Sequence, residues 1–190
     1  MKRPIAVLVG IAVIDVALIV GVVSFLEYEP KRPNLYAMSI EHPAPETPEL
    51  VSEQPLSLKV PKLKMDLVVK EGKYDAGRAS WTIDNKAAFY ATITPKPNNL
   101  SGNTLIYGHN SHQIFGNLNQ LEKDDLVYVE ATNQKTFVYK LEAVKDVEPT
   151  DLSLFEYRGN PILTIQTCAG TWYEKRRLFT FSLVEVRSAE

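Results

Sequence analysis

The chain has 190 residues, of which 45% are hydrophobic and 23% charged, and its formal net charge is −2. These values are typical of one globular domain with an additional segment. Because Lys and Arg (21) are fewer than Asp and Glu (23), a nucleic-acid partner is not expected. The single Cys excludes an internal disulfide, and it excludes zinc sites built on four Cys or on two Cys and two His.

The first segment, residues 1–26, is predicted to be a transmembrane anchor. Lys2 and Arg3 precede 22 residues, 5–26, that have membrane-spanning length. Asp15 opposes insertion, but the fifteen Ile, Val, Leu and Phe residues of this stretch outweigh it. A cleaved signal peptide is the alternative, although the stretch is longer than a typical signal core and no small-x-small cleavage site follows it.

The charges beside this stretch predict its orientation in the cell membrane. Lys2 and Arg3 lie before it, whereas Glu27 and Glu29 lie just after it. By the positive-inside rule, we expect a cytoplasmic amino terminus and an extracytoplasmic remainder. Residues 27–55 then contain six of the twelve prolines and few apolar clusters, which predicts a semi-extended linker.

From residue 56 to residue 190 the sequence consists of short β-type runs separated by turn signals. A hairpin turn is predicted near Asn133 and Gln134. Two short helices are predicted, one carrying apolar residues 114, 115, 118 and 121, and one opening at Thr150 or Asp151. The predicted strands are 56–60, 64–69, 87–91, 103–107, 126–131, 136–147, 162–168 and 178–186. So many short strands predict an all-β, eight-stranded closed barrel, because closure removes exposed strand edges.

Three reactive side chains lie near predicted strand ends. His109 follows "NTLIYG", Cys168 closes "ILTIQT", and Arg176 and Arg177 open the last strand. Since a short loop joins the last two strands, Cys168 and the arginines must lie at the same rim of the sheet. His109 joins them only if strand 103–107 runs parallel to strand 162–168 nearby.

Such a cluster suits acyl transfer. A cationic environment raises the thiolate fraction of a Cys, and the thiolate is the nucleophile. A His can protonate a departing amine and deprotonate an incoming one. An Arg can hold the substrate backbone or the oxyanion of a tetrahedral intermediate.

Each residue also has a structural interpretation. A lone Cys on an apolar strand is most often a small buried hydrophobic residue. His109 could be a surface ring in a turn, and the arginine pair a solvated strand start. His112, three residues after His109, is the alternative catalytic histidine.

The segments "TLIYGHN", "ILTIQTCAGTW" and "YEKRRLF", in this order after an anchor and a Pro-rich linker, resemble the sortases, the membrane-bound cysteine transpeptidases of Gram-positive and related bacteria. The resemblance covers essentially all of residues 56–190. It implies an eight-stranded β-barrel, cleavage of a sorting signal similar to Leu-Pro-x-Thr-Gly after Thr, and a thioacyl intermediate. Its implied partners are surface proteins bearing that signal and the amine of a cell-wall precursor or a pilin.

Carried over by position, the resemblance makes Cys168 the nucleophile and His109 the acid/base. Arg176 matches the family arginine best, and Arg177 is the alternative. The single anchor at the amino end favours a class A-like housekeeping role over pilus assembly.

The resemblance also implies substrate-binding residues. Leu152 and Leu154 fall where the family grips the leading residues of the sorting motif, and Thr167 lies beside the scissile bond. No cofactor is expected. Some relatives bind calcium through loop carboxylates; Asp151 and Glu156 lie nearby, but the sequence does not define such a site, and we predict no metal. Ile165, where Leu is usual, and the short loop after Cys168 leave the preferred signal open.

Two rival functions remain at this stage. "QTCAG" also matches the caspase-type signature, with His109 lying 59 residues upstream, but a caspase-like hydrolase needs more helix and a His followed by Gly. The other rival is a membrane-tethered β-barrel that binds a wall or surface protein, with Cys168 buried and inert.

Overall fold

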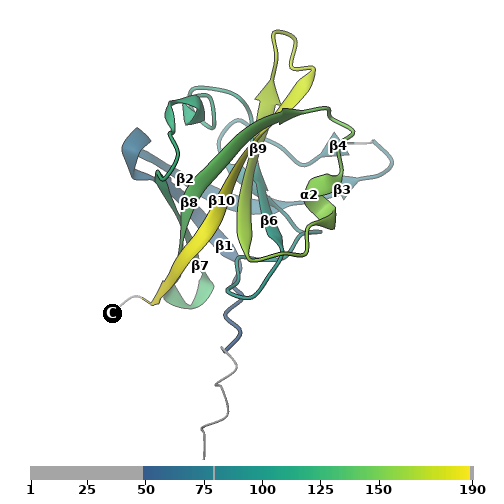
Figure 1. The fold of residues 1–190 in the computed structure, drawn as a ribbon. Coiled ribbons are helices and arrows are strands. Elements are labelled where there is room, and N and C mark those ends of the chain that lie inside the picture. The colour runs from purple at the N-terminus through teal and green to yellow at the C-terminus, as the bar shows by residue number, and fades with distance from the viewer. Residues whose placement is uncertain (1–48, 79, 189–190) are drawn as a thin grey trace, which may run out of the picture. The chain divides into compact units, whose positions relative to one another are not determined.

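The computed structural model describes residues 49–78 and 80–188, and within them eight strands close into a β-barrel (Figure 1). The strands follow one another around the barrel in the order β1, β2, β5, β6, β9, β10, β8 and β7. Their bounds are β1 (Pro55–Val60), β2 (Met65–Gly72), β5 (Ala88–Ala91), β6 (Asn103–Tyr107), β7 (Leu126–Ala131), β8 (Lys135–Val147), β9 (Ile162–Ala169) and β10 (Lys175–Ser188). The predicted eight-stranded barrel is confirmed.

Two of the strand pairs in this barrel are parallel. β2 pairs with β5 and β6 pairs with β9 in parallel register, whereas the remaining neighbours are antiparallel. A parallel pair needs a crossover connection, because the chain must return to the same end of the sheet. The parallel pairing of β6 with β9 is the condition under which His109 lies near Cys168, and the sequence alone had left it open.

The two faces of the barrel wall carry two different apolar clusters. Alternate residues of a strand point to opposite faces, so Leu163 and Ile165 of β9 pack in the interior with Ile106 of β6. Leu105 and Tyr107 of β6 belong to the second cluster, on the outer face. This cluster also contains Ala87, Phe89, Ala91, Val147, Leu154 and Leu178. Apolar side chains therefore pack on both faces of the barrel wall at β6.

The first predicted helix is replaced by turns and the 3₁₀ helix η3 (Leu118–Gln120). Its apolar side chains are buried in the interior cluster as expected. The backbone nevertheless makes i to i−3 bonds, such as Leu118 N to Phe115 O at 3.1 Å, in place of a regular helix. Gly116 and Asn117 in mid-segment have weak helix propensity, which explains the difference.

The second predicted helix is present as the single turn α2 (Ser153–Glu156). It begins two to three residues later than expected. The Asp151 carboxylate accepts a hydrogen bond from the Ser153 backbone N at 2.9 Å. The hairpin turn predicted near Asn133 and Gln134 is confirmed, and it contains the 3₁₀ helix η4 (Thr132–Gln134). A further 3₁₀ helix, η2 (Pro61–Leu63), joins β1 to β2.

A small hairpin, β3 (Tyr74–Asp75) and β4 (Ser80–Trp81), was not predicted from the sequence. Two-residue strands are too short to produce a recognisable alternation of apolar and polar residues. The hairpin lies between β2 and β5 and brings Trp81 against the outer apolar cluster.

The predicted anchor, residues 1–26, and most of the predicted linker lie outside the described residues. The last part of that linker bonds to the barrel, since Glu53 N donates to Pro97 O at 3.1 Å. Within the part of the chain that the structure describes, no helix combines the length and hydropathy needed to cross a membrane.

Candidate active site

The parallel pairing of β6 and β9 brings the His109 segment beside Cys168. Tyr107 pairs with Gln166, and continuing this register places His109 beside Cys168 at the same barrel rim. Two hydrogen bonds hold the chain there: Gly108 N donates to Gln166 O at 3.1 Å, and Thr167 Oγ1 donates to Gly108 O at 3.0 Å. Neighbouring strands lie about 4.8 Å apart, so the two backbones are adjacent.

Arg176 faces Cys168 from the other side. The antiparallel register of β9 and β10 pairs Arg176 directly with Cys168. Directly opposed residues lie on the same face, with Cβ atoms about 4.5–5.5 Å apart. Because Ile165 points into the barrel, Cys168, three positions further along β9, lies on the outer face. The structure therefore brings the three predicted catalytic residues to one rim.

Arg176 is held in place by its own loop. Its Nη1 atom donates hydrogen bonds to Tyr173 O and to Lys175 O, each at 3.0 Å. These bonds leave Nη2 and Nε without a protein partner among the described residues. Arg176 lines the groove described below, so its remaining donors are available to a bound substrate.

Arg177, the alternative arginine, belongs to a different set of contacts. Its Nε and Nη2 atoms donate to the two carboxylate oxygens of Asp146 at 2.6 and 2.7 Å, and its Nη1 donates to Asn119 Oδ1 at 2.8 Å. The Arg177 guanidinium holds the pKa of the Asp146 carboxyl below its ordinary value. Arg177 is thus already ion-paired, and it lies on the face opposite to Cys168.

The exposure of the histidines and of Cys168 also separates the candidates. His109 and Cys168 are both half-buried, whereas His112 is exposed. Cys168 is therefore neither sealed within the barrel core nor part of a disulfide. A thiol at a partly open rim can meet a substrate.

A groove of about 980 Å³ leads along the outer face to this rim. Its lining includes Leu105 and Tyr107 of β6, Gln166 of β9 and Arg176 of β10, but neither His109 nor Cys168. Gln166 and Cys168 share the outer face of β9 and are two positions apart, a rise of about 7 Å. The groove therefore ends close to the thiol.

The three predicted substrate-binding residues have different positions. Leu152 and Leu154 both line the groove, Leu152 being 60% exposed and Leu154 8%. The Thr167 side chain is 4% exposed and bonds to Gly108 O. Thr167 thus joins the Cys168 strand to the His109 segment from beneath the rim.

One wall of the groove is aromatic, and sequence reasoning missed it. The Trp81 ring stacks on Phe155 with centroids 6.3 Å apart and meets the edge of Tyr107 at 5.3 Å. Tyr107 Oη donates to Thr82 O at 2.7 Å, and burial raises the pKa of this phenol to about 12. The phenol therefore remains a donor at neutral pH and fixes the hairpin over β6. No local sequence signal links Trp81 to residues 26 and 74 positions away.

Across residues 49–78 and 80–188, no group of three or more His, Cys, Asp or Glu side chains is arranged to hold a metal ion.

Comparison with known proteins identifies the class to which this barrel and its rim belong. A sortase domain model matches residues 58–183. The chain therefore belongs to the sortase family, whose members are cysteine transpeptidases. A comparison with curated protein sequences gives no match.

The fold is also similar to solved sortase structures. Sortase C2 of pilus island 1 from Group B Streptococcus is 23% identical, with a TM-score of 0.58 over 71% of this chain and 76% of that one. Sortase E1 from Streptomyces coelicolor, solved with a tripeptide in its active site, is 24% identical, with a TM-score of 0.56 over 70% and 90%. Sortase C from Streptococcus pneumoniae is 18% identical, with a TM-score of 0.59 over 74% and 73%.

Proposed function

We propose that this sortase cleaves an LPxTG-like sorting signal between Thr and Gly and transfers the Thr acyl group to an amine of a cell-wall precursor or a pilin. The observation that carries the proposal is the register of three strands, which sets Arg176 opposite Cys168 and continues to His109 beside it. The lining of the adjoining groove includes the apolar side chains of Leu105, Leu152 and Leu154 and the rings of Trp81, Tyr107 and Phe155, which can contact an extended peptide.

The reaction takes two steps, each with one bond formed and one broken. The Cys168 thiolate attacks the Thr carbonyl carbon, and the developing oxyanion accepts hydrogen bonds from Arg176. His109 gives its proton to the departing Gly nitrogen, which leaves a thioester on Cys168. His109 then takes a proton from the incoming amine as that amine attacks the thioester and releases the Cys168 thiolate.

Two observations support the proposed substrate class. The similar Streptomyces coelicolor structure holds a tripeptide in its active site. In this chain, Leu152 and Leu154 offer apolar contacts for the leading Leu and Pro of the signal. We assign Thr167 a positioning role, since its hydroxyl is bonded to Gly108 O.

We also propose that residues 5–26 anchor the enzyme in the cell membrane, with the barrel on the extracytoplasmic side. The apolar length of this stretch and the charges on either side of it support that location. A class A-like role remains a prediction from the same anchor.

The test is transpeptidation by the full-length protein with LPxTG peptides and a primary amine, followed by mass spectrometry. An amine-exchanged product should form with the wild type. Cys168→Ala should abolish it, while His109→Ala and Arg176→Ala should each lower kcat/KM by about 10²–10³-fold or more. His112→Ala, the matched control, should keep most of the activity because His112 is exposed.

Labelling with a thiol-reactive probe provides a second measurement. Cys168, the one Cys of the chain, should react in the wild type. Absence of both labelling and product across a panel of sorting peptides would point instead to a non-catalytic binding barrel.

A further inference from the structure

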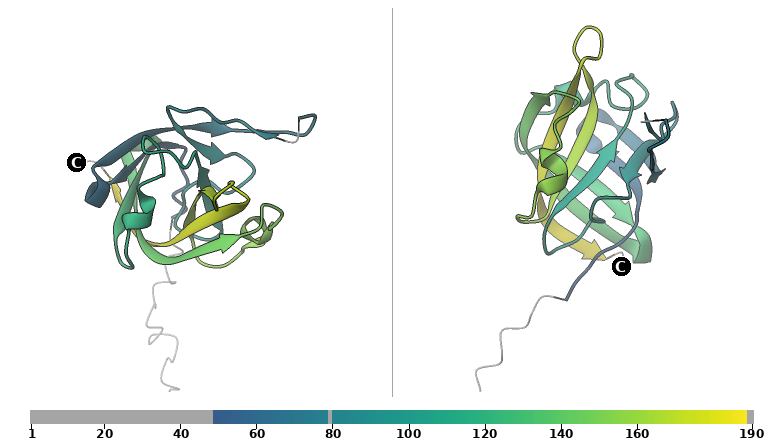
Figure 2. Two further views of the ribbon diagram at one scale, coloured as in Figure 1. Left: turned by 90° about the horizontal axis from the view of Figure 1, so that it is seen from above. Right: turned by 90° about the vertical axis from the view of Figure 1, so that its right-hand side faces the viewer.

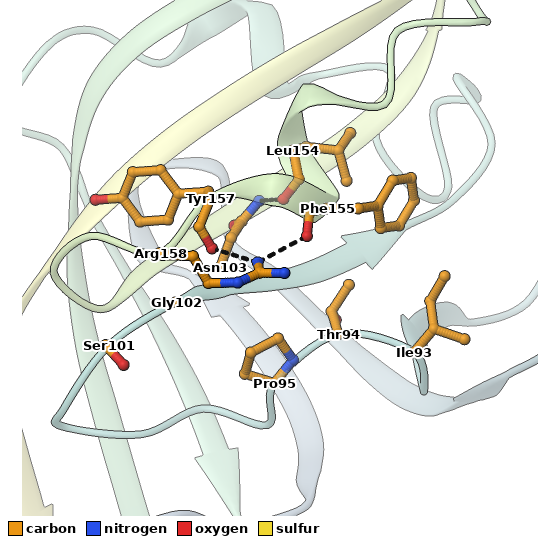
Figure 3. A pocket seen from close by; sticks show the side chains of 10 residues that line it. All are labelled: Ile93, Thr94, Pro95, Ser101, Gly102, Asn103, Leu154, Phe155, Tyr157 and Arg158. Carbon is orange, nitrogen blue, oxygen red and sulfur yellow. Dashed lines mark hydrogen bonds between the residues drawn. The ribbon is translucent and has the colours of Figure 1, made fainter.

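A second pocket, of about 400 Å³, lies next to the groove (Figure 3). It shares Ile93, Leu154 and Phe155 with the groove, so the two cavities adjoin at α2. Its other lining residues are Thr94, Pro95, Ser101, Gly102, Asn103, Tyr157 and Arg158. The catalytic chemistry proposed above uses none of these.

Strand β6 connects this pocket to the catalytic rim. Asn103 lines the pocket, Leu105 and Tyr107 line the groove, and His109 follows at the rim. Asn103, Leu105 and Tyr107 are at most 6% exposed and underlie the two cavities. The row of four residues, here called the β6 track, therefore serves as a measure of distance, about 20 Å from Asn103 to His109 at roughly 3.3 Å per residue. The pocket therefore lies at the end of the track that is far from Cys168.

The length of an extended peptide can be compared with the length of this track. With its Thr at the rim, Leu-Pro-x-Thr covers three residue spacings, or about 10 Å. The remaining half of the track takes the residues that come before the motif. The positions one to three residues upstream of the motif's Leu therefore reach the second pocket.

The charge of the pocket is opposite to that of the groove. Arg158 is the sole charged side chain among the pocket's lining residues. The groove lining, in contrast, carries the carboxylates of Glu148, Asp151 and Glu156 as well as the cations Lys73 and Arg176. An acidic peptide side chain thus meets three carboxylates in the groove, whereas in the pocket it meets a cation and no carboxylate.

Arg158 is oriented toward this space. Its Nη1 atom donates to Phe155 O at 2.9 Å and to Tyr157 O at 2.8 Å, which fixes the guanidinium across the pocket (Figure 3). Within the described part of the chain, no carboxylate pairs with Arg158, and its Nε and Nη2 hydrogens have no protein acceptor. A guanidinium with two such donors matches a carboxylate.

We propose that the pocket is a subsite for the residues one to three positions before the sorting motif, and that Arg158 there selects an Asp or Glu side chain. This inference rests on the proposed transpeptidase function. The competing explanation is that Arg158 serves only to bond the end of the α2 turn, in which case the charge of the peptide has no effect.

The test uses LPxTG peptides that carry Glu, Gln or Lys at each of the three upstream positions. Transpeptidation by the full-length protein gives kcat/KM, and anisotropy with the Cys168→Ala protein gives affinity without turnover. At one or more of these positions, Glu should exceed Gln by about two- to fivefold, as expected of an exposed ion pair. The preference should shrink as salt is raised.

Variants of Arg158 separate charge recognition from support of the turn. Arg158→Gln should remove the preference, Arg158→Glu should reverse it in favour of the Lys peptides, and Arg158→Lys should retain part of it. Thermal unfolding monitors the fold of each variant. Arg187→Gln is the matched control, because it removes the same charge on β10, eleven positions beyond Arg176, and should leave the preference unchanged.

Equal values for the Glu, Gln and Lys peptides would overturn the subsite while leaving the transpeptidase function intact. A Glu preference that persists in Arg158→Gln would also overturn it, since another group would then be responsible. Failure of every peptide to react with the wild type and to bind the Cys168→Ala protein would remove the proposed function and the subsite with it.

Discussion

Arg176 and Arg177 are adjacent in sequence but differ in every contact that matters for function. Arg176 is opposite Cys168 and lines the groove, whereas Arg177 pairs with Asp146 of β8. The pleat of the strand causes this division, because successive side chains point to opposite faces. One arginine is thereby available to the substrate, and the other fastens β10 to β8.

The ion pair of Arg177 and Asp146 makes stability depend on pH at the acidic end. The pKa of Asp146 is lowered in the folded state, so its contribution is complete above the unfolded value of about 3.9 and is lost as the pH falls through the lower folded value. The side chains are 31% and 35% exposed, so solvent screens the pair and it is worth about 0.5–1 kcal/mol.

Asp146→Asn should therefore lower Tm at neutral pH, and the wild-type and variant Tm values should converge toward about pH 2. Thermal unfolding followed by circular dichroism across this range measures the difference. A Tm difference that is independent of pH would assign the loss to packing and not to the carboxylate charge.

At the scale of elements, the β3–β4 hairpin provides a wall that the barrel alone lacks. Trp81 is fixed there between Phe155 and Tyr107, and all three rings line the groove. Because these rings line the groove, they offer apolar surface to the leading residues of the proposed sorting peptide. We therefore expect the hairpin to contribute to the specificity of the proposed enzyme.

Trp81→Ala should lower kcat/KM for an LPxTG peptide by about two- to tenfold, mainly through KM, because a stacking surface is lost and the reacting groups are not. Trp81→Phe should retain most of the value. Trp172 is the other Trp of the chain, 85% exposed and outside the groove, so Trp172→Ala should leave KM for this peptide unchanged. An unchanged KM in Trp81→Ala would exclude the wall from substrate binding.

At the scale of the barrel, the chain enters at one end and the catalytic rim lies toward the other. Residues 49–54 lead into β1 at the end opposite to the loop 170–174 that follows Cys168 (Figures 1 and 2). Each barrel strand is hydrogen-bonded to a neighbour on both sides, because the sheet is closed. The strands beneath the groove are therefore held rigidly in place.

The proposed anchor gives a prediction for the whole molecule in cells. The full-length protein should sediment with membranes and be released by detergent but not by high salt, because about 20 apolar residues bind through the hydrophobic effect and not through charge. A chain lacking residues 1–26 should appear in the soluble fraction. Release of the full-length protein by salt alone would contradict the anchor.

The sequence by itself predicted the barrel strands and nominated the candidate reactive residues. Short β-type runs bounded by turn signals are local features, so they located the eight barrel strands and the hairpin turn near Asn133. The Gly-His and Thr-Cys motifs nominated His109 and Cys168, and the family resemblance favoured Arg176 over Arg177. Gly116 and Asn117 have weak helix propensity, but the spacing of the apolar residues around them gave a stronger signal and led to the prediction of a helix there.

The tertiary structure alone decided which segments became neighbours. Alternation says which face a residue takes but not which strand lies beside it, so the parallel pairing of β6 with β9 could not be read from either strand. The aromatic wall and the Arg158 pocket depend on contacts between segments far apart in the chain. Such contacts are fixed by packing and backbone bonding across the whole barrel, and no short stretch of sequence contains that information.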